Sequence, residues 1–334
     1  MPRWRSMSRG SGASGRGPEV EAPREEGEER RSRPRGSFRQ AEELFDGLED
    51  PIVEEGPKAP PRQPQRRRAV RGETTKRILV AIPWIAFAIA IVVAGGLVFA
   101  IAMIAIGALA LHEYFAMTEG LRPIEIGTYA AVAALILAAH FGTAFNVLMV
   151  LAASFLVLFI LGADRKHRDG ISVSMGVSLL AVVWIGLPLV HAVLLRQLPN
   201  HGAALLVDVL IGTFVTDTAA YATGRMFGSH RIAPSLSPNK TLEGLIGGFL
   251  IGAMSVWFAG LYQNWLSGID ALILGAAVAA LAPLGDLFES TLKRDLGRKD
   301  TGRLFGPHGG ILDRLDAVFF TVVLGYYLAV QLVY

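Results

Sequence analysis

Long apolar runs separated by short polar segments dominate the chain from Ile78 onward. Each run is about as long as the ~20 residues that a helix needs to cross the hydrocarbon core of a bilayer. Nine such runs can be counted, with approximate bounds Ile78–Ala94, Leu97–Met117, Ile124–His140, Phe145–Leu161, Ile171–Leu195, Ala203–Thr223, Leu245–Tyr262, Ile269–Leu284 and Ala317–Tyr334. The pattern predicts an all-α, polytopic integral membrane protein with about nine transmembrane helices.

Residues 1–77 have a different composition. They are rich in Arg, Glu, Gly, Pro and Ser, and they hold 18 of the 32 Lys and Arg residues and 14 of the 29 Asp and Glu residues. A segment of this kind cannot bury enough apolar surface to offset the entropy lost on ordering. We therefore predict a disordered tail at 1–77 and a single membrane domain at 78–334.

The basic residues beyond the tail predict the orientation. With the tail in the cytoplasm and nine crossings, 13 of the 14 later Lys and Arg residues lie on the cytoplasmic side and only Arg196 lies outside, as the positive-inside rule expects. The first two runs meet at Gly95–Gly96, and merging them into one kinked segment would spoil this distribution. We therefore expect a cytoplasmic N-terminus, an external C-terminus, and both large polar segments, Gly224–Gly244 and Asp286–Asp316, on the cytoplasmic face.

Composition narrows the chemistry. The chain contains no cysteine, which excludes disulfides, thiolate catalysis and Cys-ligated zinc. The basic isoelectric point does not indicate nucleic-acid binding, because most of the bases lie in the tail.

Two groups of acids lie at the ends of apolar runs. Asp286, Glu289, Ser290 and Lys293 are spaced i, i+3, i+4, i+7, so they share one face if the helix continues beyond the apolar run. A solvated helix end would explain Glu289 and Lys293. Asp286 follows the apolar run directly, and acids at that depth are usually functional.

Asp313 and Asp316 are also spaced i, i+3, at the start of the last helix, where the helix dipole favours negative charge. Capping by Asp313 alone would leave Asp316 unexplained. Paired carboxylates without cysteine suit a hard cation, Mg²⁺ before zinc. Asp217 lies inside an apolar run among Gly and Ala residues; either a structural hydrogen bond or a metal or substrate role would account for it.

The segment Gly224–Gly244 carries bases among Gly, Ser and Pro, a composition that can form a phosphate cradle. Its spacing is not that of a Walker loop. Arg225 and Arg231 are equally explained as positive-inside anchors, whereas Lys240, just before a candidate helix cap at Thr241, is the stronger candidate. His308, flanked by glycines in GPHGG, fits either a catalytic or a structural role. No role is evident for Glu113.

Taken together, these residues resemble a known family. Ser290–Asp316 reads S-T-L-K-R, four residues, K-D-T-G, and then F-G-P-H-G-G-I-L-D-R-L-D, which is similar to the signature of the phosphatidate cytidylyltransferases (CDP-diacylglycerol synthases). The upstream S-P-N-K-T with its following E-G, and Asp217-x-x-x-Tyr221-x-x-Gly224-Arg225, also resemble that family. The resemblance covers the chain from about Ile78 to the C-terminus.

The resemblance implies transfer of CMP from CTP to phosphatidate in the cytoplasmic leaflet of a bacterial plasma membrane, giving CDP-diacylglycerol and pyrophosphate for phospholipid biosynthesis. It further implies one or two Mg²⁺ ions, with a monovalent ion as an alternative second ion, and a homodimer. Carried over by motif, the catalytic residues are Lys293, Arg294, His308, Asp313, Arg314 and Asp316. The substrate-binding residues are Ser237, Asn239, Lys240, Thr241, Glu243, Ser290, Lys299, Asp300, Gly309 and Gly310, and the metal ligands are Asp217, Asp286, Asp313 and Asp316.

Three other functions fit parts of the pattern. A polyprenol or dolichol kinase-like enzyme would share the acids and bases at the cytosolic rim, but the long signature disfavours it. A CDP-alcohol phosphotransferase is disfavoured because its D-G-x-x-A-R repeat is missing. An ion-coupled transporter would place its acids near the midplane and show an internal repeat, neither of which is found.

Overall fold

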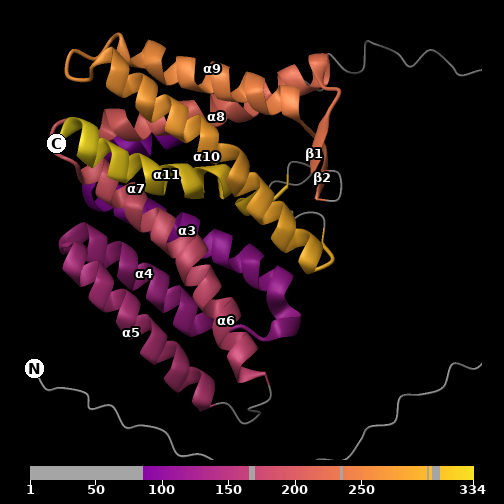
Figure 1. Ribbon diagram of the computed structural model, residues 1–334. Helices are drawn as coiled ribbons and strands as arrows, with labels where there is room; N and C mark the ends of the chain where they lie inside the picture. The colour runs from indigo at the N-terminus through magenta and orange to yellow at the C-terminus, as the bar shows by residue number, and fades with distance from the viewer. Residues whose placement is uncertain (1–85, 165–169, 234–235, 299–300, 303–308) are drawn as a thin grey trace, which may run out of the picture. The chain divides into compact units, whose positions relative to one another are not determined.

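The computed structural model describes residues 86–164, 170–233, 236–298, 301–302 and 309–334. This part of the chain is helical except for one short β-hairpin (Figure 1). The predicted tail at 1–77 lies outside the described residues. The all-α prediction is confirmed, with the hairpin as an addition that the apolar pattern could not reveal.

Among the residues described, seven helical segments are long and apolar enough to cross a membrane, so the protein is a multi-pass membrane protein. They are α3 (Gly96–Thr118) with the short helix η1 (Glu119–Leu121), α5 (Ala144–Ala163), α6 (Ile171–Ala181) joined to α7 (Leu187–Gln197) by the π-helical turn η2 (Val182–Gly186), α8 (Gly202–Phe227), α9 (Leu242–Gly260), α10 (Gly268–Asp295) and α11 (Leu312–Val333). The apolar helix α4 (Glu125–Phe141) has 17 residues and is shorter.

Eight of the nine predicted runs coincide with these helices. The first run, Ile78–Ala94, is described only from residue 86, and its backbone is helical from there to residue 94. Gly95 and Gly96 then adopt positive φ angles of 61° and 51°, a conformation that glycine tolerates without steric cost. The break between the first two runs is therefore present, while the total of nine crossings stays a prediction.

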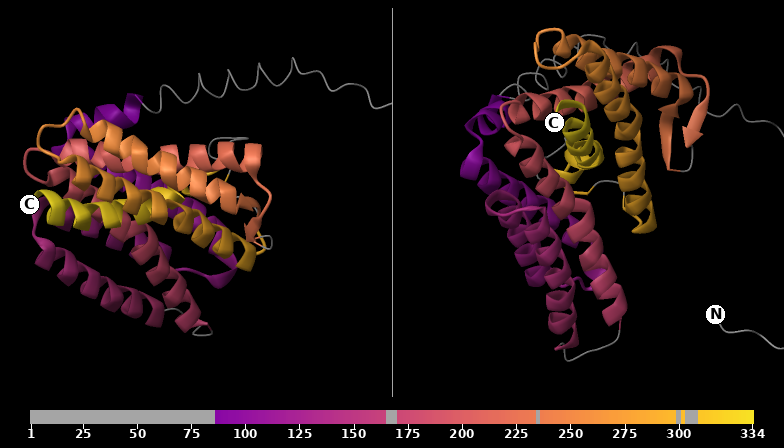
Figure 2. Two further views of the ribbon diagram at one scale, coloured as in Figure 1. Left: turned by 45° about the horizontal axis from the view of Figure 1, so that its top comes forward. Right: turned by 60° about the vertical axis from the view of Figure 1, so that its left-hand side comes forward.

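Small residues let the helices approach closely. A Cβ at Gly248 of α9 would lie 2.7 Å from the Ala220 Cβ of α8, and one at Gly275 of α10 would lie 2.6 Å from the Ala253 carbonyl oxygen of α9. Such contacts are typical of helix packing in membranes, where small side chains bring backbones together. Helices α8, α9, α10 and α11 consequently pack side by side, as all three views show (Figure 2).

Helix α5 is the contrasting element. It packs on α4 and leaves many large apolar side chains exposed, among them Phe145, Leu148 and Phe155. Only 11% of its most apolar window is buried. In a protein that crosses a bilayer, such a surface faces lipid, so α5 lies at the periphery of the described bundle.

Two features of the fold position the polar residues. A hairpin of β1 (Arg231–Ala233) and β2 (Ser237–Thr241) is antiparallel, with Arg231 opposite Thr241, and it lies beside the C-terminal half of α10 (Figures 1 and 2). At Gly285 of α10, an added Cβ would contact the Asp316 carbonyl oxygen and lie 2.8 Å from the Ala317 Cα of α11. The absence of a side chain there brings the acidic stretches of α10 and α11 together.

Candidate functional site

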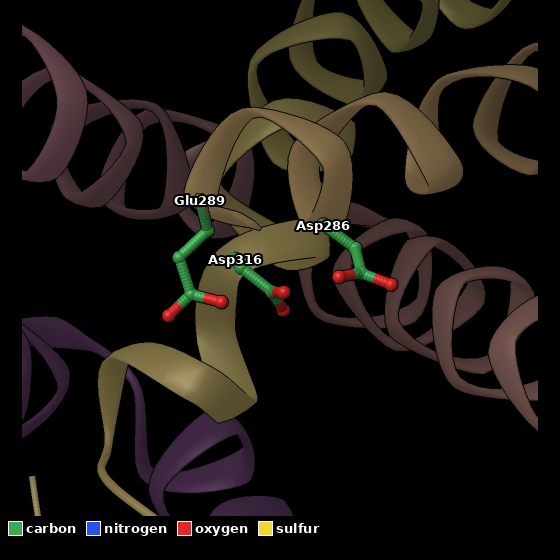
Figure 3. A group of neighbouring side chains, drawn as sticks. All are labelled: Asp286, Glu289 and Asp316. Atoms are coloured by element: carbon green, nitrogen blue, oxygen red, sulfur yellow. The ribbon is translucent and has the colours of Figure 1, made fainter. Parts of the chain in front are cut away.

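Three carboxylates converge where α10 meets α11. Asp286 and Glu289 project from α10 and Asp316 projects from α11, and each offers an oxygen within 4.8 Å of the others (Figure 3). We call these three residues the acidic cluster. Glu289 and Asp316 are buried, with 1% and 8% of their surfaces exposed, while Asp286 is half-buried. The shared helical face follows from the i, i+3 spacing, because α10 continues past its apolar run to Asp295.

Glu289 is the main correction to the sequence interpretation, which accommodated Glu289 and Lys293 on a solvated helix end. Glu289 is instead fully buried, and its Oε2 accepts a hydrogen bond from Lys293 Nζ at 2.9 Å. Its Oε1 is buried without a hydrogen-bond partner among the described residues. The i+3 spacing from Asp286 was visible in the sequence, but burial depends on how α10 and α11 pack.

Two lysines border the acidic cluster. Lys293 Nζ bridges Glu289 Oε2 and Asp313 Oδ1, at 2.9 and 2.8 Å. Lys240, at the end of the hairpin, reaches Asp286 Oδ2 at 2.8 Å and also donates to the Pro283 carbonyl oxygen at 3.2 Å. The structure therefore brings the predicted Lys240 and Lys293 to the same group of acids from segments far apart in the sequence.

Asp313 is held by donors on both carboxylate oxygens. Oδ1 accepts from Lys293, and Oδ2 accepts from the Gly310 backbone at 2.8 Å and from Thr301 Oγ1 at 2.9 Å. Gly309 has a φ of 85°, and a Cβ there would lie 2.9 Å from Asp313 Oδ2. The backbone at these glycines thus packs closely on Asp313. Asp313 is not one of the three converging carboxylates of the acidic cluster.

Glu113 is a buried residue to which the sequence assigned no role. It lies near the end of α3, it is 4% exposed, and its Oε2 accepts a hydrogen bond from the Leu312 backbone at 3.0 Å. In the sequence, the one indication of a role for Glu113 is that it is an acid near the end of an apolar run. The contact with α11 joins residues 199 positions apart, which no local pattern could reveal.

The remaining predicted residues divide between the cluster and its surroundings. Ser290 Oγ lies 3.4 Å from Asp286 Oδ1, and Arg294 Nε lies 3.5 Å from the Leu236 carbonyl oxygen in the hairpin turn. Asp217 of α8 is close enough to interact electrostatically with Asp286 and Asp316, although it is outside the group of three.

Several predicted binding residues have other contacts. Thr241 is the N-cap of α9, as expected, and accepts from the Gly244 backbone at 3.1 Å. Glu243 pairs with His230 at 2.7 Å. Ser237 and Asn239 lie on β2, where Asn239 is exposed.

Of the remaining predicted site residues, the structure describes only some. Arg314 is exposed in the first turn of α11. The predicted Lys299, Asp300 and His308 lie outside the described residues. Their roles stay predictions.

The donor set suits a hard divalent cation. The acidic cluster offers only carboxylate oxygens, which are the ligands preferred by Mg²⁺ and Ca²⁺. Buried carboxylates are costly unless they are paired or bind a metal. The partnerless Oε1 of Glu289 is such an uncompensated group, so the residues present fit a metal centre.

The sequence is similar to proteins of known class. The profile of the cytidylyltransferase family matches residues 75–332. The chain is 32% identical over 295 residues to a phosphatidate cytidylyltransferase of Synechocystis sp., an alignment that covers 77% of this chain and 97% of that protein.

Shorter alignments reach higher identity. The chain is 42% identical over 133 residues to a phosphatidate cytidylyltransferase of Thermotoga maritima, covering 38% of this chain and 49% of that protein. It is 43% identical over 126 residues to one of Haemophilus influenzae, covering 36% and 43%. These two matches span less than half of each relative, whereas the Synechocystis match spans nearly all of it.

Proposed function

The chain belongs to the cytidylyltransferase family, and from this premise we propose that it is a phosphatidate cytidylyltransferase, transferring CMP from CTP to phosphatidate. The observation that carries the proposal is the arrangement at the α10–α11 contact, where the acidic cluster meets Lys240 and Lys293. Acids that can hold a metal, next to cations that can hold phosphates, are what a reaction between two phosphate-bearing substrates requires.

In the proposed reaction, an oxygen of the phosphatidate phosphate attacks the α-phosphorus of CTP. The new P–O bond joins lipid and CMP, and the bond from the α-phosphorus to the bridging oxygen breaks, so that pyrophosphate leaves with that electron pair. A phosphate monoester is already anionic near neutral pH, so no strong general base is needed. Catalysis then depends on positioning and on neutralising the charge of the phosphates.

The two lysines are placed for that task in different ways. Lys293 is fixed between Glu289 and Asp313, so its position is set before substrate arrives. Lys240 belongs to the hairpin, and its partners within the described part of the chain are Asp286 and the Pro283 carbonyl oxygen. We assign both to the substrate phosphates, together with the more exposed Arg294, and with Arg314, Lys299 and His308 as motif-based candidates.

Mg²⁺ would be held by Asp286, Glu289 and Asp316, with Asp217 as a neighbouring acid. When bound, the ion supplies positive charge that neutralises the phosphate oxygens and orients them. The set differs from the motif-based one in taking Glu289 in place of Asp313, because Glu289 converges with Asp286 and Asp316 whereas Asp313 is not one of the converging carboxylates.

The cellular setting follows from the same reasoning. The distribution of bases favours a cytoplasmic position for the hairpin and the acidic cluster. CTP would then come from the cytosol and phosphatidate from the inner leaflet of a bacterial plasma membrane. The homodimer is proposed on the family resemblance alone.

The test is an assay of the detergent-purified full chain with labelled CTP, Mg²⁺ and phosphatidate. We expect pyrophosphate release that depends on the lipid, together with a CMP-bearing lipid. We expect Asp316→Asn to lower turnover by about 10²–10³-fold, since it removes charge from the centre of the site. Release of CDP with a newly phosphorylated lipid would point to a kinase instead, and folded protein without either product would refute the proposal.

A further inference from the structure

Glu113 is a buried acid on α3, a helix that contributes no residue to the acidic cluster. Its neighbours on α3, Leu111, Tyr114 and Phe115, are buried as well. A carboxylate in such surroundings is costly unless hydrogen bonds compensate for its lost hydration. The contacts of Glu113 should therefore explain why an acid occupies this buried position.

The first contact is with the N-terminus of α11. Leu312 is the first residue of that helix, and the backbone N–H groups of a first turn have no partner within their own helix. The preceding Ile311 provides no side-chain cap, and Glu113 Oε2 accepts the Leu312 N–H at 3.0 Å. Glu113 thus caps α11 from another helix, with a negative charge at the end where the helix dipole favours it.

The second contact leads to Asp313. Thr301 Oγ1 lies 2.9 Å from Asp313 Oδ2 and 3.4 Å from Glu113 Oε2. A hydroxyl has one proton to donate, and the shorter distance assigns it to Asp313. Asp313 in turn holds Lys293, which holds Glu289. Glu113 is therefore linked to the acidic cluster through the first turn of α11, since it accepts from the backbone of Leu312, the residue next to Asp313.

Two glycines near the N-terminus of α11, Gly302 and Gly310, pack against the carboxylate of Glu113. A Cβ at Gly302 would lie 2.6 Å from Glu113 Oε1, and one at Gly310 would contact both Glu113 Oε2 and Thr301 Oγ1. Neither position admits a side chain while Glu113 is in place. The backbone at Gly302 and at Gly310 thus packs directly on Glu113.

We infer that Glu113 is a positioning residue of the transfer reaction, which fixes the N-terminus of α11 and thereby the placement of Asp313 and Lys293. The inference rests on the proposed function for its catalytic part. Glu113 itself contacts neither lysine among the described residues, so its effect reaches them through Thr301, Leu312 and Asp313.

The test compares Glu113→Leu, which removes the acceptor, with Glu113→Gln, which keeps one oxygen able to accept the Leu312 N–H. Tyr114→Phe is the matched structural control. It removes a partly buried hydrogen bond made by the next residue of α3, from Tyr114 Oη to the carbonyl oxygen of Val177 in α6, and so leaves the contact with α11 in place. Turnover per folded protein is measured well below each melting temperature, and hydrogen exchange is followed in residues 309–316.

We expect Glu113→Leu to lower kcat by about 100-fold, as small misplacements of catalytic groups do, with KM for CTP changed by less than about threefold. Exchange in residues 309–316 should become faster. Glu113→Gln should recover kcat to within about tenfold of the unsubstituted protein, because its amide oxygen retains the cap. Tyr114→Phe should lower the melting temperature and leave kcat and this exchange unchanged.

Normal kcat in Glu113→Leu, or unaltered exchange in residues 309–316, would overturn the inference. A kcat loss in Tyr114→Phe as large as that in Glu113→Leu would also overturn it, by showing a general effect of destabilising α3. An unsubstituted protein without turnover would refute the proposed function instead, and the exchange rates would still decide whether Glu113 fixes α11.

Discussion

The buried acid Asp208 and the acidic cluster lie in two regions of the bundle whose surroundings differ. Asp208 of α8 is 2% exposed, and both of its oxygens accept from Gln263 Nε2, at 3.0 and 2.9 Å. In the acidic cluster, Glu289 and Asp316 are similarly buried, but carboxylates there face one another. The first region is a closed pair of one acid and one neutral amide, whereas the second gathers several acids around two lysines.

The difference indicates how a structural acid can be distinguished from a functional one. The amide of Gln263 donates to both oxygens of Asp208, and the atom of this pair that lacks a hydrogen-bond partner among the described residues, Gln263 Oε1, belongs to an uncharged group. The acidic cluster retains a buried, partnerless oxygen on Glu289, and Asp316 has no Lys or Arg within ion-pair distance among the described residues. Gathering like charges is unfavourable unless a cation joins them, so the convergence of several carboxylates, and not burial alone, distinguishes the acidic cluster.

Among the substitutions that test this difference between the two regions, Glu289→Gln should have the largest effect on turnover. The substitution is nearly isosteric, keeps an acceptor for Lys293 and removes one negative charge from the acidic cluster. We expect turnover at limiting Mg²⁺ to fall on the order of 100-fold, with partial recovery at higher Mg²⁺, because metal ligands and their supports affect affinity by such factors. The measurement is a Mg²⁺ titration of CMP transfer.

The matched control is Glu125→Gln, which changes an exposed acid in the first turn of α4. Its Mg²⁺ dependence should equal that of the unsubstituted protein. Equal Mg²⁺ curves for Glu289→Gln and Glu125→Gln would show that Glu289 is not part of a metal centre, and the two buried regions would then be alike.

A smaller effect is expected from separating the two helices that form the acidic cluster. In Gly285→Ala the added methyl would contact the backbone of Asp316 and Ala317, so α11 must shift away from Asp286. Because small misplacements can cost up to about 100-fold, we expect a roughly tenfold loss of turnover for a shift of a fraction of an ångström. Gly176→Ala, where a methyl has nothing within 4 Å, should leave turnover unchanged. Full activity in Gly285→Ala would mean that the close α10–α11 contact does not set the distance between the carboxylates.

Much of the fold was predictable because its signal is local. A run of apolar residues long enough to cross a bilayer must be helical to satisfy its own backbone, and eight predicted runs coincide with described helices. The hairpin β1–β2 was not predicted, since Ser237–Thr241 contains Pro and Asn and has no alternating apolar pattern. The backbone groups of β2 form hydrogen bonds with β1, which composition cannot reveal, so the segment was interpreted as a loop.

The site was predictable only in part, for the same physical reason. Asp286, Asp316, Lys240 and Lys293 were identified from spacing and motif, and the structure brings them together. The burial of Glu289 depends on the packing of α10 against α11, and the role of Glu113 depends on a contact between α3 and α11. Both are tertiary effects that no single segment encodes.

The smallest effect on activity should come from the closed pair, through Asp208→Asn. One oxygen of the new amide can still accept from Gln263, while its NH₂ group faces the Nε2 donor and loses the second contact. The loss of one buried hydrogen bond costs about 1 kcal/mol, so the melting temperature in detergent should fall slightly, whereas kcat and the Mg²⁺ dependence should stay unchanged. Thermal unfolding and the CMP-transfer assay measure the two quantities on one sample. An altered Mg²⁺ dependence in Asp208→Asn, like the one expected for Glu289→Gln, would contradict this distinction. It would show that an acid paired with a neutral amide affects metal binding as much as an acid in the acidic cluster does.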